Sequence, residues 1–214
     1  MKAMILAAGR GERMRPLTDT IPKPLLKIGN DTLIEKNIFK LVDAGITDIV
    51  INVAYLGDQI KKYLGNGERY NATILYSDEG DRALGPGGGI LKALPLLGNE
   101  HFVLMSADIV SDFPIATLLK RTHYAAHLMM VENPNFHPKG DYGIDKHGFL
   151  TTQEPKLTYG SYSIWHPSVF KNKTVEYAEI TPFIHTLIQE SNITGEKFTG
   201  PWINIGTPDQ LINS

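Results

Sequence analysis

The chain has 214 residues, of which 42% are hydrophobic and 21% are charged, which is the usage of an ordinary globular protein rather than a disordered or collagen-like one. With 21 Lys and Arg against 23 Asp and Glu, the formal charge is -2, so no overall basic field gathers nucleic acid or a membrane surface. The sequence has no cysteine, which excludes disulfides, thiolate metal sites and cysteine nucleophiles and fits a reducing compartment. We therefore expect a cytoplasmic protein that binds anions through a local site, with neither nucleic acid nor membrane as a partner.

The first half of the chain alternates short apolar runs with amphipathic ones, which is typical of β–α–β units around a mostly parallel sheet. Strands are predicted over 2–6, 48–53, 72–77 and 101–107, and helices over 31–44, 58–64 and 88–97. Within 31–44, apolar residues such as Ile34, Ile38 and Leu41 repeat at the spacing of one helical face, and Gly45 is a stop signal.

Beyond residue 110 the pattern changes. Strands are predicted over 125–131, 142–145 and 157–165, with a proline-rich loop over 133–140 between the first two. A late helix is predicted over 180–190, and a final strand over 202–205 precedes a short C-terminal helix. We expect this half to add a second, mixed part to the sheet.

The turn after the first strand carries the most informative chemistry. Gly9 and Gly11 let the backbone approach a bulky anion, and Arg10, Arg13, Arg15 and Lys23 supply positive charge, so the turn suits a phosphate. A dinucleotide fingerprint would need glycine in place of Met14, and a Walker loop would need a Gly-Lys dipeptide, which the sequence lacks. A solvated basic turn with structural glycines is the alternative.

Residues 9–18, followed by Pro22-Lys23-Pro24, resemble the signature of the sugar-1-phosphate nucleotidyltransferases. The resemblance continues through 44–53, 84–89, Asp108 and 202–207, so it covers nearly the whole chain in order. It implies an α/β fold of the three-layer, Rossmann-like GT-A type, with a central mixed, mostly parallel sheet. It also implies a single domain over 1–214, with a nucleotide-binding half (1–110) and a sugar-binding half (111–214).

The activity implied by the resemblance is attack of a sugar 1-phosphate oxygen on the α-phosphorus of a nucleoside triphosphate, with Mg2+ bound and pyrophosphate leaving. Residues 131–142 resemble members that act on N-acetylmuramate 1-phosphate, which implies UTP as the donor, UDP-N-acetylmuramate as the product and a role in peptidoglycan recycling. Glucose, mannose or N-acetylglucosamine 1-phosphate with another triphosphate is the alternative within the class. The small-molecule partners are thus UTP and a sugar 1-phosphate, and a monomer is favoured.

The resemblance also implies roles for individual residues, Arg13 and Lys23 being the catalytic residues that hold the triphosphate. The expected nucleotide site comprises Ala8, Gly9, Gly11, Glu12, Arg13, Lys23, Glu79, Gly85, Gly87 and Gly88. Glu79 would accept the N3–H of uracil and repel the acceptor that cytosine presents there. The expected sugar site comprises Ser106, Gly140, Asp141, Gly143 and Glu154. For the lactyl carboxylate of the acceptor, Arg82, His137 and Lys139 are candidates.

The expected metal ligands are Asp108 and Asn204. Asp108 ends an apolar strand, where the ligands of open α/β sheets bind, and its carboxylate suits Mg2+. Asn204 stands where the family has a second metal aspartate, so one negative charge is lost beside the ion. A non-catalytic sugar-nucleotide-binding homologue is therefore a further alternative.

Overall fold

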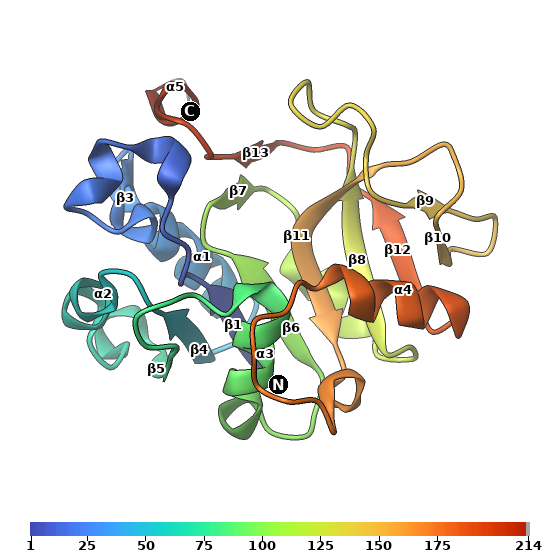
Figure 1. Ribbon diagram of the computed structural model, residues 1–214, viewed down its shortest axis with the longest axis horizontal. Coiled ribbons are helices and arrows are strands. Elements are labelled where there is room, and N and C mark those ends of the chain that lie inside the picture. Colours follow the sequence, from blue (N-terminus) through green and yellow to red (C-terminus); the bar gives the residue numbers. More distant parts are fainter. Residues whose placement is uncertain (213–214) are drawn as a thin grey trace.

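A seven-stranded sheet runs through the computed structural model, which describes residues 1–212 (Figure 1). Its order is β12-β8-β11-β6-β1-β4-β5. The strands are β1 (Lys2–Leu6), β4 (Asp48–Val53), β5 (Thr73–Asp78), β6 (Phe102–Ser106), β8 (Ala126–Val131), β11 (Thr158–Trp165) and β12 (Ile193–Lys197). The pairs β6–β1, β1–β4, β4–β5 and β12–β8 are parallel, whereas β11 is antiparallel to both β6 and β8. The predicted mixed, mostly parallel sheet is confirmed.

Helices cover both faces of this sheet. They are α1 (Leu33–Asp43), α2 (Gly57–Leu64), α3 (Gly85–Leu97) and α4 (Thr181–Gln189), with α5 (Pro208–Ile212) near the end of the chain. No helix in the described part of the chain combines the length and the apolar character that crossing a bilayer requires. The predicted three-layer α/β architecture is confirmed.

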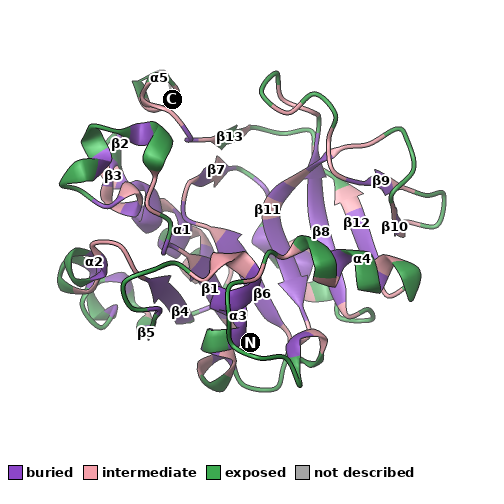
Figure 2. Cartoon of the chain, in the orientation of Figure 1, coloured by how far each residue is buried: buried purple, intermediate pink, exposed green. Residues whose placement is uncertain are grey.

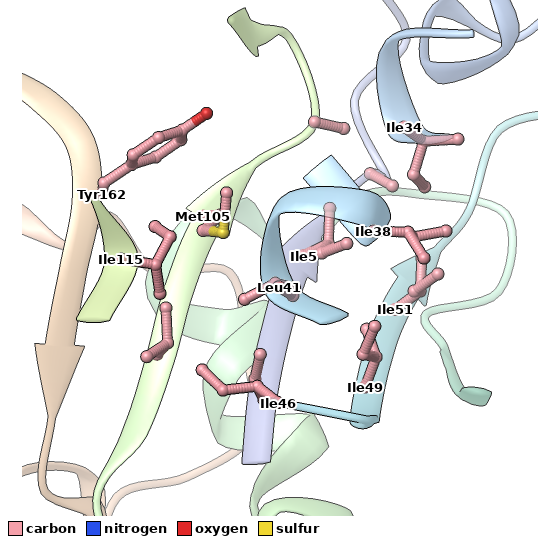
Figure 3. Packing of buried hydrophobic residues seen from close by; sticks show 14 of the residues in the cluster. Ile5, Ile34, Ile38, Leu41, Ile46, Ile49, Ile51, Met105, Ile115 and Tyr162 are labelled. Atoms are coloured by element: carbon pink, nitrogen blue, oxygen red, sulfur yellow. The ribbon is translucent and has the colours of Figure 1, made fainter. Parts of the chain in front are cut away.

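Each face of the sheet has its own hydrophobic core. The strands of the central sheet are mostly coloured as buried, whereas many loops are coloured as exposed (Figure 2). On one face, Ile5 and Ile51 of the sheet pack against Ile38 and Leu41 of α1 (Figure 3). On the other, Met4 and Leu104 pack with residues of α3 and α4. The side chains of β1 and β6 alternate between the two cores, as the two-residue period of a strand requires.

Smaller elements flank the sheet as three two-stranded ribbons and several 3-10 turns. The ribbons pair β2 (Lys27–Ile28) with β3 (Asp31–Thr32), β7 (Ile109–Ser111) with β13 (Trp202–Asn204), and β9 (Gly143–Ile144) with β10 (Leu150–Thr151). The 3-10 turns span Glu12–Met14, Leu17–Asp19, Lys23–Leu25, Glu68–Tyr70, Ile115–Lys120 and Pro167–Phe170. The strands predicted over 142–145 and 202–205 therefore exist as β9 and β13, but in ribbons outside the central sheet.

Two differences from the predicted elements have clear physical reasons. The helix predicted from residue 31 begins at Leu33, because Thr32 is its N-cap and forms a capping box with Glu35. Strand β12 was not predicted, because only Ile193 in it is a large apolar residue and its centre is Gly195. A Cβ on Gly195 would lie 2.6 Å from Leu150 Cδ2, so close packing at that glycine takes the place of an apolar pattern.

Asn37 is a buried polar residue of α1 that ties the helix to the sheet. Its Nδ2 donates to the carbonyls of Ala107 (3.3 Å) and Ile109 (3.2 Å), and its Oδ1 accepts from the hydroxyl of Tyr162 (3.0 Å). Burial raises the pKa of that hydroxyl, so it stays a donor. These contacts hold the segment on both sides of Asp108.

We expect Asn37→Ala to lower the free energy of unfolding by about 1–3 kcal/mol, because it removes the hydrogen bonds that Asn37 donates to two buried carbonyls and the one that it accepts from the Tyr162 hydroxyl. Urea denaturation followed by circular dichroism measures this change. Asn135→Ala, at an exposed loop position, is the matched control. A change below about 0.5 kcal/mol in Asn37→Ala would show that the contact does not stabilise the fold.

Candidate active site

A cleft of about 380 Å³ opens where the parallel strands β1, β4 and β6 have their carboxyl ends. Its lining comes from the ends of these strands, the loop after β1, Lys23 and the start of α3. The lining residues are Leu6, Ala7, Ala8, Gly9, Gly11, Glu12, Arg13, Lys23, Pro24, Asn52, Glu79, Ala83, Gly85, Pro86, Ser106, Ala107, Asp108 and Gly206. The fold therefore brings together most of the predicted nucleotide residues with Ser106 and Asp108.

The loop after β1 folds back on itself beside this cleft. Gly11 has φ 69°, and a Cβ there would lie 3.1 Å from Thr18 Cγ2 and 3.2 Å from Lys23 Cβ. The Thr18 hydroxyl donates to the Gly11 carbonyl at 2.9 Å. By contrast, a Cβ built on Gly9 would meet none of the described heavy atoms within 4 Å. Gly11 thus closes the loop, and Gly9 leaves its backbone open to a ligand.

The four basic residues of the loop region divide into two pairs. Arg10 donates to the Thr18 carbonyl (2.6 Å) and to Asp19 Oδ1 (2.8 Å), and its guanidinium lies 3.9 Å from the Tyr55 ring centroid. The hydrogen bond from Arg10 holds the pKa of Asp19 below its usual range. Arg15 Nε also contacts Asp19, at 2.8 Å. Arg10 and Arg15 therefore stabilise the loop, whereas Arg13 and Lys23 line the cleft.

Lys23 and Asp108 form an ion pair inside the cleft. Lys23 lies on the 3-10 turn Lys23–Leu25 directly after Pro22, and Asp108 follows β6. Their side chains are 12% and 28% exposed, so the pair is largely shielded from water and is screened less than a surface pair.

Asn204 lies beside Asp108 through the β7–β13 ribbon. Asn204 is paired with Ile109, and the Ile205 N–H donates to the Asp108 carbonyl at 2.9 Å. The Asn204 side-chain oxygen is buried and has no hydrogen-bond partner among residues 1–212. Asn204 itself is not part of the cleft lining. A buried oxygen without a partner, on the residue before the one whose N–H binds the Asp108 carbonyl, fits a hard cation such as Mg2+. The described residues contain no cluster of three or more His, Asp or Glu side chains able to hold a metal, so phosphates and water would complete the coordination.

Glu79 follows β5 and lines the opposite side of the cleft. Its Oε1 accepts from Asn52 Nδ2 (2.7 Å) and its Oε2 from the Leu84 N–H (2.6 Å). Sequence reasoning assigned no role to Asn52, because a lone asparagine in an apolar strand matches no motif.

Gly87 and Gly88 are buried and face a strap of residues 176–179 rather than the cleft. Both donate their N–H groups to the Ala178 carbonyl, at 2.9 and 3.1 Å. A Cβ on Gly87 would lie 2.6 Å from the Glu179 carbonyl oxygen, and one on Gly88 would lie 2.2 Å from that of Glu176. Of the predicted glycines in this loop, the cleft is lined by Gly85.

Four predicted sugar-binding residues lie outside the lining of this cleft, in or beside the β9–β10 ribbon. Asp141 Oδ1 pairs with His137 Nε2 (2.9 Å), and its Oδ2 accepts from the Tyr159 N–H (2.8 Å). Gly140 has φ 61°, and Gly143 begins β9. Glu154 Oε2 accepts from the Lys156 N–H at 3.0 Å.

The cleft at the carboxyl edge of the three-layer sheet has two cations, Arg13 and Lys23, and an open glycine backbone, together with three carboxylates, Glu12, Glu79 and Asp108. The cations and the open backbone suit a phosphorylated ligand. The chain belongs to the nucleotidyl transferase family, whose model matches residues 2–214. It is 40% identical to the N-acetylmuramate alpha-1-phosphate uridylyltransferase of Neisseria meningitidis serogroup B, over 99% of this chain and 95% of that protein.

Other relatives match this chain at lower sequence identity. A mannose-1-phosphate guanyltransferase of Schizosaccharomyces pombe is 36% identical over 99% of this chain, which spans 62% of that longer protein. A crystal structure of a putative glucose-1-phosphate thymidylyltransferase from Bacillus anthracis, in complex with sucrose, matches with a TM-score of 0.88 and 23% identity. That match covers 100% of this chain and 93% of the other, and it supports the same fold.

We expect Gly88→Ala to lower the midpoint of thermal unfolding, although alanine favours a helix over glycine by about 1 kcal/mol. The added Cβ collides with backbone of the strap, which has to move at a cost of about 1–3 kcal/mol. Gly9→Ala is the control, since its Cβ points into open space and its unfolding midpoint is expected to stay unchanged. If Gly88→Ala is as stable as the wild type, the strap does not pack on this glycine as described.

Proposed function

We propose that this chain transfers UMP from UTP to N-acetylmuramate 1-phosphate in a Mg2+-dependent reaction that gives UDP-N-acetylmuramate and pyrophosphate. The observation that carries the proposal is the 40% identity along 99% of the chain with the Neisseria meningitidis uridylyltransferase. The cleft supports it, because its charged residues suit the phosphates of both substrates. We also propose that the protein is a monomer that acts in peptidoglycan recycling in the cytoplasm, because nucleoside triphosphates are available there.

The chemistry requires little from the protein by way of acid or base. A phosphate monoester has a second pKa near 6, so the attacking oxygen is already mostly ionised at neutral pH. It forms a bond to the α-phosphorus while the bond to the pyrophosphate oxygen breaks. The protein has to hold two anions in line and offset their repulsion, which is positional and electrostatic work.

Arg13 and Lys23 are the residues proposed to offset this repulsion, with Lys23 nearest the α-phosphate. Lys23 is positioned by its packing against Gly11 and by its pair with Asp108, both in the cleft. Asp108 and Asn204 would hold the metal ion, which when bound offsets phosphate charge. The open backbone at Gly9 would donate N–H hydrogen bonds to phosphate oxygens.

Glu79 is proposed to select the base. An ionised carboxylate accepts a hydrogen bond from the N3–H of uracil but repels the lone pair at N3 of cytosine. The glycine–proline pair Gly85-Pro86 lines the same part of the cleft and leaves space for a flat ring.

The residues proposed to contact the sugar are Ser106, Gly140, Asp141, Gly143 and Glu154. Ser106 lines the cleft beside Asp108. The other residues lie on loops of the second half, where the pair of Asp141 with His137 stabilises the proline-rich loop. Lys139 is exposed on the same loop and can offset the charge of a lactyl carboxylate.

The proposed function is tested by pyrophosphate release with a matrix of triphosphates and sugar 1-phosphates. We expect UTP with N-acetylmuramate 1-phosphate to give the highest kcat/KM, and we expect Lys23→Ala to abolish nearly all turnover while circular dichroism stays unchanged. Lys27→Ala, at an exposed lysine of β2, is the matched control and is expected to stay active. Equal or better use of N-acetylglucosamine or glucose 1-phosphate would contradict the acceptor, and active Lys23→Ala would contradict the phosphate contact.

We expect Asn204→Asp to lower the Mg2+ concentration that gives half-maximal activity about tenfold, equivalent to about 1.4 kcal/mol. A second carboxylate beside Asp108 attracts the ion by several kcal/mol before dehydration is subtracted. Asp108→Asn is expected to change the Mg2+ requirement in the opposite direction. A Mg2+ titration in which Asn204→Asp has no effect would show that residue 204 does not contact the metal.

A further inference from the structure

Three hydrogen bonds connect the ends of β1, β4 and β5 with the start of α3, at the part of the cleft where the nucleotide base is proposed to bind. The Ala7 N–H donates to Asn52 Oδ1 at 2.8 Å, and Asn52 Nδ2 donates to Glu79 Oε1 at 2.7 Å. The Leu84 N–H donates to Glu79 Oε2 at 2.6 Å. The chain of contacts runs from the end of β1 through β4 and the residue after β5 to the N-cap of α3.

Asn52 and Glu79 are both buried, at 3% and 7% exposure. A buried carboxylate is costly unless hydrogen bonds satisfy it, and here neutral donors bind each of its two oxygens. Because both oxygens are fixed, the carboxylate cannot rotate about its last torsion without losing a bond. Each oxygen keeps a lone pair, so Glu79 still has capacity to accept from a ligand in the cleft that it lines.

Gly89, in the first turns of α3, provides a second and independent sign of how closely this pair is packed. A Cβ at position 89 would lie 2.6 Å from Glu79 Oε1 and 2.8 Å from Asn52 Nδ2. Any larger residue would therefore separate the amide from the carboxylate. The absence of a side chain at Gly89 therefore leaves room for the Asn52–Glu79 hydrogen bond.

We propose that Asn52 is a positioning residue for base selection: it holds the Glu79 carboxylate in the orientation that accepts the N3–H of a uracil ring. The proposal rests on the proposed function, in which Glu79 contacts the base. Without the Asn52 donor, one carboxylate oxygen has no fixed partner and the group can turn away from the base. UTP then loses its advantage over CTP, while the phosphate contacts of both nucleotides are the same.

The test compares the dissociation constants of UTP and CTP by calorimetry in wild type, Asn52→Leu and Asn52→Asp. Asn52→Leu keeps the side-chain size but removes both hydrogen bonds, and we expect the preference for UTP to fall about tenfold. Gly89→Ala breaks the same contact from the other side and is expected to reduce the preference in the same direction. Thr194→Val is the matched control, because it removes a buried hydrogen bond to His127 on β8. Circular dichroism verifies that each variant is folded.

The Asn52→Asp variant distinguishes a loss of UTP preference caused by a lost hydrogen bond to Glu79 from a loss caused by altered packing. One oxygen of the aspartate can still accept from Ala7, but the other faces Glu79, and two neighbouring carboxylates share a proton only at lower pH. We expect the preference for UTP to be lost at about pH 8.5 and restored at about pH 6, when a shared proton recreates the hydrogen bond. The wild-type amide does not titrate, so its preference should stay constant between these values.

The inference is overturned if Asn52→Leu and Asn52→Asp keep the wild-type preference for UTP. It is also overturned if Asn52→Asp loses the preference and does not recover it at the lower pH, because packing alone then explains the loss. A wild-type protein that binds neither UTP nor CTP contradicts the proposed function instead. The same variants are then compared with the nucleotide that does bind, whose affinity must fall in Asn52→Leu for the positioning role to hold.

Discussion

Burial of β6 on both faces determines where the charged residues of the cleft can lie. Phe102 and Leu104 face one hydrophobic core and Val103 and Met105 the other, while β1 and β11 pair with its two edges. A register shift of one residue would exchange the large apolar side chains between these cores, so packing on both faces specifies the register of the strand. Ser106 and Asp108 then emerge at its carboxyl end, where β1 and β4 also end. The cleft follows from the packing of an apolar strand.

Charge in the cleft is arranged locally, since the whole chain carries a formal charge of -2. Asp19 binds Arg10 and Arg15, and this pairing gives the loop after β1 its shape. Arg13 and Lys23 are thereby directed to the cleft, and Lys23 meets Asp108 there. The loop thus separates cations that maintain its fold from cations placed to meet an anion. A surface with uniform positive charge would attract phosphates without orienting them.

The sequence predicted the strands whose apolar residues are continuous, such as β1 and β4, because such runs are typical of parallel strands covered on both faces. It did not predict β12, where a glycine at a close contact replaces an apolar pattern. In the candidate site, the motif residues Gly9, Gly11, Arg13 and Lys23 line the cleft as expected. Gly87 and Gly88 face the strap instead. The sequence could not predict this, because a run of glycines indicates that another group packs closely against the backbone but does not identify that group. Asn52 contacts Ala7, which lies 45 positions earlier in the sequence, and Glu79, which lies 27 positions later. No local sequence pattern contains contacts at such separations.

The antiparallel insertion of β11 between β6 and β8 has a consequence for synthesis on the ribosome. Strand β6 ends at Ser106 and β11 begins at Thr158, so roughly 50 residues, or several seconds of translation, separate a strand from one of its two partners. During that interval the outer edge of β6 exposes unpaired backbone groups, which are a template for pairing with another chain. β8 is made in the same interval and receives its second partner only with β12, near the end of the chain. Until β11 and β12 have been made, the open edges of β6 and β8 are therefore the parts of the nascent sheet at which pairing with another chain is expected.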